Sequence, residues 1–142
     1  MLPDAGLPQT WLRYAESDLA LAEAKTDYRV LLENLCFHAQ QVVEKSIKAV
    51  LVLRGIAFPK THNLERLLDL LPADVTPTQE LLEARALSGY ATVMRYPGAA
   101  EHPSEAEYRN ALRLATAALD WAKWVVDDDR DSLFEGRGQS AT

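Results

Sequence analysis

Arg95 and His102 carry a guanidinium and an imidazole, two groups that together suffice in kind for metal-free cleavage of RNA. An arginine can neutralise the charge that grows on phosphate oxygens, and a histidine can transfer a proton near neutral pH. The nucleophile would be the 2′-hydroxyl of the RNA itself. In a plainer interpretation, Arg95 binds carbonyls at the end of one helix and His102 merely precedes the next. Spacing alone leaves both interpretations open, because short motifs also match by accident.

A second group of cationic residues lies upstream. Lys45 and Lys48 are neighbours on one side of a predicted helix. Lys60 and His62 fall at the predicted start of another helix, where backbone amides attract anions. With Arg95, these four residues are the predicted nucleotide- or phosphate-binding set.

Each part of this set has a simpler alternative. The polar side that carries Lys45 and Lys48 could be an ordinary solvated face, with Glu44 and Lys48 as a surface ion pair worth about 0.3–0.5 kcal/mol. The segment around His62 could serve only to cap a helix, with Thr61 or Asn63 accepting from its free amides.

The main element that must position these side chains is a long amphipathic stretch between residues 31 and 54. It contains neither Gly nor Pro, and its apolar residues recur at helical spacing: Leu31, Leu35, Ala39, Val42, Val43, Ile47, Val50 and Leu51. This pattern predicts a helix that is buried along one side. Gly55 follows directly and predicts a left-handed stop. We expect the other helices to pack around this one.

Four further helices are predicted at residues 8–25, 62–71, 77–95 and 104–127. The third of these begins with Thr76 as N-cap in a capping box, and the fourth begins with the capping box Ser104-Glu105-Ala106-Glu107. Three aspartates at 127–129 oppose the negative end of a helix dipole, so we expect the last helix to end there. No stretch shows the period-two alternation of a strand. The prediction is an all-α, five-helix up-and-down bundle in one domain, residues 1–130, with a C-terminal tail at 131–142.

Composition limits the function. The 142 residues carry a net charge of −6, so the chain lacks a global basic field that would attract nucleic acid, and any phosphate contact must come from a local patch. The single cysteine, Cys36, excludes a disulfide within the chain and fits a cytoplasmic location. No signal peptide or membrane span is predicted. The three histidines lie far apart without a ligand partner at metal-binding spacing, so we expect neither a metal nor a cofactor.

The chain resembles the HEPN family (higher eukaryotes and prokaryotes nucleotide-binding) from about Trp11 to Val126. The specific block is CFHAQQVVEKSIKA at 36–49, and weaker support comes from residues 11–19, from KTHNL at 60–64 and from Arg95-Tyr96-Pro97. The resemblance implies a compact helical bundle that commonly dimerises. Many members are metal-independent endoribonucleases with an arginine–histidine motif, and the Arg-x6-His spacing of Arg95 and His102 fits at its outer limit. Other members accompany a small nucleotidyltransferase, as a toxin–antitoxin pair or as a substrate-binding subunit.

Three departures favour the nucleotide-binding branch of the family. Tyr96 follows the arginine where the ribonuclease branch usually has a polar residue, Pro97-Gly98 interrupts the motif, and Pro103 follows His102. We therefore expect a dimeric module that binds a nucleotide or RNA phosphate and partners a nucleotidyltransferase. A metal-independent endoribonuclease is the alternative, and a helical scaffold without a small-molecule site is the second. The expected homodimer uses the last helix or the polar side of residues 31–54.

Overall fold

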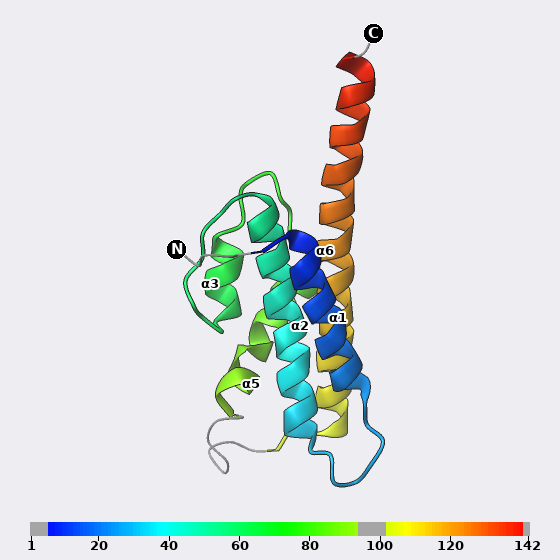
Figure 1. Cartoon of the computed structure of the whole chain (residues 1–142). Coiled ribbons are helices and arrows are strands. Elements are labelled where there is room, and N and C mark those ends of the chain that lie inside the picture. The colour runs from blue at the N-terminus through cyan, green and yellow to red at the C-terminus, as the bar shows by residue number, and fades with distance from the viewer. Residues whose placement is uncertain (1–5, 94–101, 141–142) are drawn as a thin grey trace.

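A computed structural model describes residues 6–93 and 102–140 of the chain (Figure 1). These residues form the helices α1 (Pro8–Glu23), α2 (Leu32–Leu53), α3 (Leu64–Asp69), α4 (Gln79–Glu83), α5 (Ser88–Val93) and α6 (Glu105–Ser140), with a 3₁₀ turn, η1, at Ala84–Leu87. The described residues contain no strand. The predicted all-α class is therefore confirmed.

The central element is α2, as predicted. It packs against α1 on one side and α6 on another, and also contacts α3, η1 and α5 (Figure 1). The largest fully buried apolar side chains come from α2 and the helices around it: Ile47, Leu51, Leu64, Leu67, Leu81 and Leu114. Burial of this apolar surface around one long helix is the main favourable contribution to folding.

Gly55 ends α2 in the way that the sequence predicts. Its φ is +68°, a left-handed conformation that residues with a Cβ adopt at a cost. The amide of Gly55 donates to the carbonyl of Val52 at 3.1 Å, and the amide of Ile56 donates to the carbonyl of Leu51 at 2.9 Å. These two bonds are the Schellman pattern, and they satisfy carbonyls that the end of α2 would otherwise leave unpaired.

The predicted N-caps are confirmed for two helices. At the start of α6, Ser104 and Glu107 exchange two hydrogen bonds of 3.1 Å, each between a side chain and a backbone amide. At the start of α3, the Asn63 side chain accepts from the amide of Arg66 at 3.3 Å. The position predicted for the α4 cap was wrong: Thr78 rather than Thr76 is the cap, and its Oγ1 accepts from the amide of Leu81 at 3.1 Å.

The predicted single helix at 77–95 is interrupted by η1 between α4 and α5. Leu81, Ala84 and Leu87 are all buried, and they recur every third residue. Residues three apart eclipse one another in a 3₁₀ helix, whereas they drift around an α-helix. The tighter winding of η1 therefore keeps Ala84 and Leu87 on the core-facing side, where Leu81 of α4 also lies.

The predicted end of the last helix near 127–129 was also wrong, because α6 continues to Ser140. Its C-terminal turns project beyond the other helices (Figure 1). Since the helix continues, Asp127, Asp128 and Asp129 lie in its interior and not at the negative end of its dipole. An aspartate inside a helix costs only a fraction of a kcal/mol, which does not stop propagation.

Candidate functional site

Four polar residues on one side of α2 are buried rather than solvated. Gln40, Gln41, Glu44 and Lys48 are all less than one-tenth exposed, at 0%, 9%, 3% and 8%. The alternative of a surface Glu44–Lys48 ion pair is therefore wrong. The cause is that α1 and the segment after α2 pack over this side: Trp11 and Phe58 lie against Lys48, and His62 contacts Glu44.

Glu44 is the centre of a buried hydrogen-bond network. Its Oε2 accepts from Lys48 Nζ at 3.0 Å, while its Oε1 lies 2.8 Å from His62 Nδ1 and accepts from Gln40 Nε2 at 3.2 Å. Gln41 Nε2 adds a longer contact to Oε1 at 3.4 Å. Burial acts to raise the pKa of Glu44, but the Lys48 charge and the hydrogen bonds from His62, Lys48 and Gln40 outweigh it, so this pKa is lowered. Glu44 is therefore ionised at neutral pH.

Lys48 is held by aromatic rings as well as by Glu44. Its Nζ lies 5.7 Å from the centroid of the Trp11 ring and 5.4 Å from that of Phe58. The two rings themselves meet edge to face, with centroids 6.0 Å apart. Both distances from the ammonium lie within the range of a cation–π contact. Lys48 therefore joins α1 and the 55–63 segment to α2, and its ammonium is already engaged within the chain.

A second polar cluster joins α1 to α2 at Asp18. Its Oδ1 lies 3.0 Å from His38 Nδ1, and its Oδ2 accepts from Lys45 Nζ. Asp18 is 7% exposed, whereas the side chains of His38 and Lys45 are 30% and 25% exposed. A buried carboxylate thus lies behind two more accessible donors and orients both of them. One signal for this role is present in the sequence, since Asp18 falls within the apolar spacing of α1 between Ala15 and Ala22.

Lys60 and His62 lie in the segment before α3. Lys60 is exposed, and the His62 side chain is 46% exposed while its ring contacts Glu44. The carbonyl of His62 accepts from Gln40 Nε2 at 3.1 Å, which fixes the segment against α2. Capping also operates here as expected, because Asn63 caps α3 and Thr61 Oγ1 accepts from the amide of Asn63 at 3.1 Å. Of the predicted set, Lys45, Lys48 and His62 thus lie on the same side of α2.

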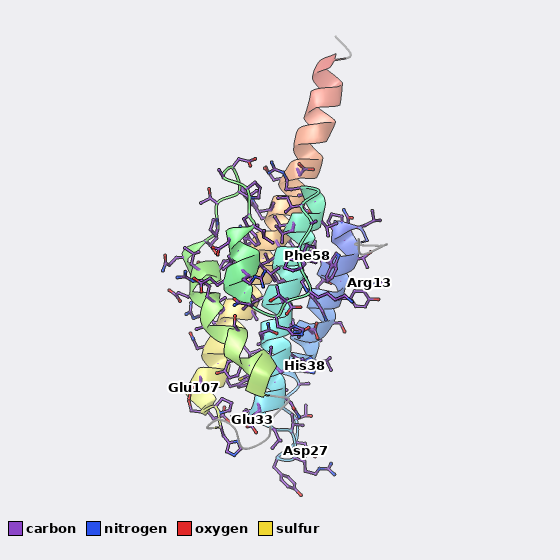
Figure 2. The ribbon with its side chains drawn as sticks, turned by 90° about the vertical axis from the view of Figure 1, so that its left-hand side faces the viewer. Arg13, Asp27, Glu33, His38, Phe58 and Glu107 are labelled. Carbon is purple, nitrogen blue, oxygen red and sulfur yellow. The ribbon has the colours of Figure 1, made fainter. Side chains whose placement is uncertain are left out.

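His102 lies elsewhere, at the end of the bundle where α2 and α6 begin. Its side chain is 81% exposed, and its Nδ1 pairs with Glu33 Oε2 at 3.0 Å. Figure 2 shows Glu33 and Glu107 at this end, with His38 farther along α2. Glu33 and Glu44 are separated by about 16 Å along the helix axis at 1.5 Å per residue, so His102 does not join the lysine clusters. Arg95 lies outside the described residues, and its predicted roles stay predictions.

Cys36 is buried and has the character of an apolar side chain. Burial raises the pKa of its thiol to about 11, against a smaller opposing effect of the hydrogen bond with Tyr90. Burial likewise raises the pKa of Tyr90 to about 12. Both groups are therefore neutral at physiological pH, which makes Cys36 a poor nucleophile.

Neither a metal-binding group nor a membrane-spanning helix is seen in the described part of the chain. Among residues 6–93 and 102–140, no three His, Cys, Asp or Glu side chains come together in an arrangement that could hold a metal ion. Over the same residues, none of the helices has both the length and the apolar character needed to cross a bilayer.

The arrangement defines a class of protein: an all-α bundle built on one long helix whose polar side is buried in a carboxylate–lysine–histidine network. The chain belongs to the HEPN family, since the model of the HEPN domain matches residues 8–125. The crystal structure of TT1696 from Thermus thermophilus is similar, with a TM-score of 0.69 and 29% sequence identity over 83% of this chain and 97% of that one. ST0689, an archaeal HEPN homologue, matches with a TM-score of 0.58 and 26% identity over 87% of this chain and 98% of its own. The comparison with curated proteins gives no match.

Proposed function

We propose that this HEPN protein is a binding module for the phosphate of a nucleotide or of RNA. One observation carries the proposal: Asp18 and Glu44, both buried, lie behind the more accessible donors Lys45, His38 and His62. Donors that are already oriented lose less conformational entropy when an anion binds. Lys60, exposed beside His62, adds a further positive charge.

The carboxylates also predict how strong this binding is. Asp18 balances Lys45 and Glu44 balances Lys48, so these lysine–carboxylate pairs carry little net charge. Binding of a phosphate must therefore come from hydrogen bonds with a modest Coulomb contribution. We expect selective, weak binding of a nucleotide rather than tight, nonspecific binding of RNA.

Calorimetric titration with ATP at low and moderate salt tests this proposal. Replacement of Lys45 by Met should weaken ATP binding by about tenfold, the loss typical of one charge-assisted hydrogen bond. Lys123 on α6 provides the matched control, because it also pairs with a carboxylate, Glu16 at 2.8 Å, but bonds to neither Asp18 nor Glu44 in the structure. Equal losses in Lys45→Met and Lys123→Met, or no binding to the wild-type chain, would count against the proposal.

We further propose that the module is a homodimer that partners a small nucleotidyltransferase in a toxin–antitoxin-like pair. Support for an interface comes from the exposed apolar residues on and beside α1: Leu7 at 66%, Tyr14 at 53% and Leu21 at 48%. These three are spaced seven apart, so they lie along one side of the helix. Light scattering of the wild type and of Tyr14→Glu, followed by co-purification with the product of the adjacent gene, tests both parts. A monomer that retains no partner would refute them.

The second candidate function is a metal-independent endoribonuclease, with Arg95 holding phosphate and His102 as acid or base. The observation that favours it is the Glu33–His102 pair at 3.0 Å, because a carboxylate on Nδ1 fixes the orientation of the imidazole that would transfer the proton. RNA products with 2′,3′-cyclic phosphate ends in the presence of EDTA would support this activity. Cleavage that survives His102→Ala would exclude the assignment. Failure of both binding and cleavage would leave a helical scaffold.

A further inference from the structure

A groove lies at the end of α2 opposite to His102. Its lining residues have no role in the proposed phosphate site. It is a cavity of about 280 Å³ between the end of α2, residues 74–76 and the side of α6. The apolar part of its lining consists of Leu53, Val75 and Val125. On the α6 side it is also lined by Trp124, Asp128 and Asp129. Its α6 lining residues lie between 124 and 129, before the C-terminal turns of α6 that project beyond the other helices in Figure 1.

Negative charge dominates this groove. Among the described side chains, three aspartates line it, and the one lining cation, Arg54, already pairs with Asp74 through two hydrogen bonds of 2.8 and 3.1 Å. Asp129 also acts on this guanidinium, since it adds to the larger effect of Asp74 in raising the pKa of Arg54. Asp128 and Asp129 therefore leave a local excess of negative charge, on a chain whose net charge is already −6.

Trp124 adds an aromatic surface beside these carboxylates. It is 66% exposed, although it is a large and mainly apolar side chain. Asp128 is four residues later, so its carboxylate lies one turn from the indole on the same side of the helix. An indole face beside a carboxylate is complementary to a guanidinium group, which can stack on the ring while it donates to the carboxylate oxygens.

We propose that this groove is a docking site for an arginine-bearing basic segment of a partner protein. A guanidinium stacks on Trp124 and donates to Asp128 and Asp129, while the aliphatic part of the segment covers Val75 and Val125. Nucleic acid does not fit, because its phosphates would face three carboxylates. A divalent cation does not fit either, because no metal-binding group is present among the described residues.

The walls of the groove are fixed before any partner arrives. The indole Nε1 of Trp121 donates to the carbonyl of Thr76 at 3.2 Å, which joins α6 to the 74–76 segment. The paired hydrogen bonds between Arg54 and Asp74 join the same segment to the end of α2. A preformed groove reduces the entropy cost of binding, so a weak electrostatic contact can still be selective.

The test uses the full chain and a fluorescently labelled peptide of alternating arginine and serine, with fluorescence anisotropy as the readout. The matched probe replaces arginine by citrulline, which keeps the shape of the side chain but removes its charge. We expect the arginine peptide to bind and the citrulline peptide not to bind. Trp124→Ala should weaken binding about threefold, the scale of an exposed cation–π contact. The double replacement Asp128→Asn with Asp129→Asn should weaken it on the order of tenfold.

Asp127 offers a matched control on the same helix. It is exposed and next to Asp128, but it does not line the groove. Asp127→Asn should change the affinity by less than about twofold, an effect of diffuse charge alone. Equal losses for Asp127→Asn and the double variant would overturn the proposal in favour of nonspecific attraction. The proposal would also be overturned if the citrulline peptide bound, or if the arginine peptide bound fully to Trp124→Ala. A third contrary result would be dissociation of a homodimer on addition of peptide, because it would mean that a second copy of the chain occupies the groove.

This outcome is independent of the phosphate site. None of the groove residues belongs to the Glu44 or Asp18 clusters. Loss of peptide binding with intact ATP binding, or the reverse, therefore separates the two proposals.

Discussion

Removing the Glu44 carboxylate should be among the most destabilising single changes to this protein. Glu44 is 3% exposed, and the side chain of Lys48 is 10% exposed with its ammonium 3.0 Å from the carboxylate. Glu44→Ala leaves that ammonium without its counter-charge and leaves Gln40 and His62 without their shared acceptor. Breaking a buried ion pair from one side costs about 3–5 kcal/mol.

Urea unfolding monitored by circular dichroism measures this cost. For a slope of about 2 kcal/mol/M, a loss of about 4 kcal/mol lowers the unfolding midpoint by about 2 M. Lys48→Met should cost less than Glu44→Ala, because the carboxylate then keeps its bonds from Gln40 and His62 and the methionine still packs against Trp11 and Phe58. The slope should stay unchanged if both variants retain the native fold.

A double-mutant cycle isolates the pair itself. Glu44→Gln with Lys48→Met removes both charges and keeps the side-chain volumes close to native. The double variant should be more stable than the sum of the single losses predicts, by about 2 kcal/mol or more. A coupling energy below about 0.5 kcal/mol would refute the reasoning, because it would mean that the aromatic rings and water already neutralise Lys48.

Acid provides a second measurement of the same group. The pKa of Glu44 is lowered from the ordinary value of 4.5, so the unfolded chain takes up this proton more readily than the folded one. The stabilisation from ionised Glu44 is therefore complete above pH 4.5 and is lost as the pH falls through the folded pKa. Glu44→Gln lacks this contribution, so its stability should fall less than that of the wild type between about pH 6 and pH 3.

Three further predictions concern single positions. Gly55→Ala should cost about 1–2 kcal/mol in urea unfolding because the φ of +68° is strained for a residue with a Cβ, although no atom lies within 4 Å of the added methyl group. Ser104→Ala removes the α6 cap and should lower stability by about 1 kcal/mol, with Ser104→Asp restoring it. Cys36 should resist a thiol reagent at pH 8 and react quickly in urea, because burial raises its pKa to about 11; rapid labelling of the folded chain would contradict this.

The central helix could be predicted because its signals are local. The apolar spacing between Leu31 and Leu51 and the glycine at 55 specify where α2 runs and how it stops, and neighbouring residues decide both. The same holds for the capping box at Ser104. Such signals need no knowledge of the rest of the chain, which is why the all-α bundle was correctly predicted.

The environment of the lysines could not be predicted in the same way. Lys45 pairs with Asp18, and Glu44 contacts His62, across 27 and 18 residues of sequence. Sequence spacing along a helix predicts only the Glu44–Lys48 pair, and it does not indicate whether that pair is buried. Burial follows from α1 and Phe58 closing over this side, a tertiary effect that overrides the polar pattern. Asp18, the most informative residue missed, is marked only by its position within the apolar spacing of α1.

The 3₁₀ turn and the length of α6 were missed for different reasons. A spacing of three at Leu81, Ala84 and Leu87 fits either an α-helix or a 3₁₀ turn in sequence, and only the shape of the neighbouring core distinguishes them. At Asp127–Asp129, the dipole penalty applies only if the helix ends there, so it cannot decide where the end lies. A penalty of a fraction of a kcal/mol per residue does not terminate a helix by itself.

The hydrogen bond from Tyr108 Oη to the carbonyl of Ala22, 2.6 Å long, connects residues 86 positions apart and bears on how the chain reaches its fold. The α1–α2 hairpin is formed by residues close in sequence, so it can assemble early during synthesis, whereas α6 is made later. Until α6 arrives, the apolar residues of α2 that it covers stay open to water. The nascent chain is therefore most vulnerable to aggregation in the interval before α6 leaves the ribosome.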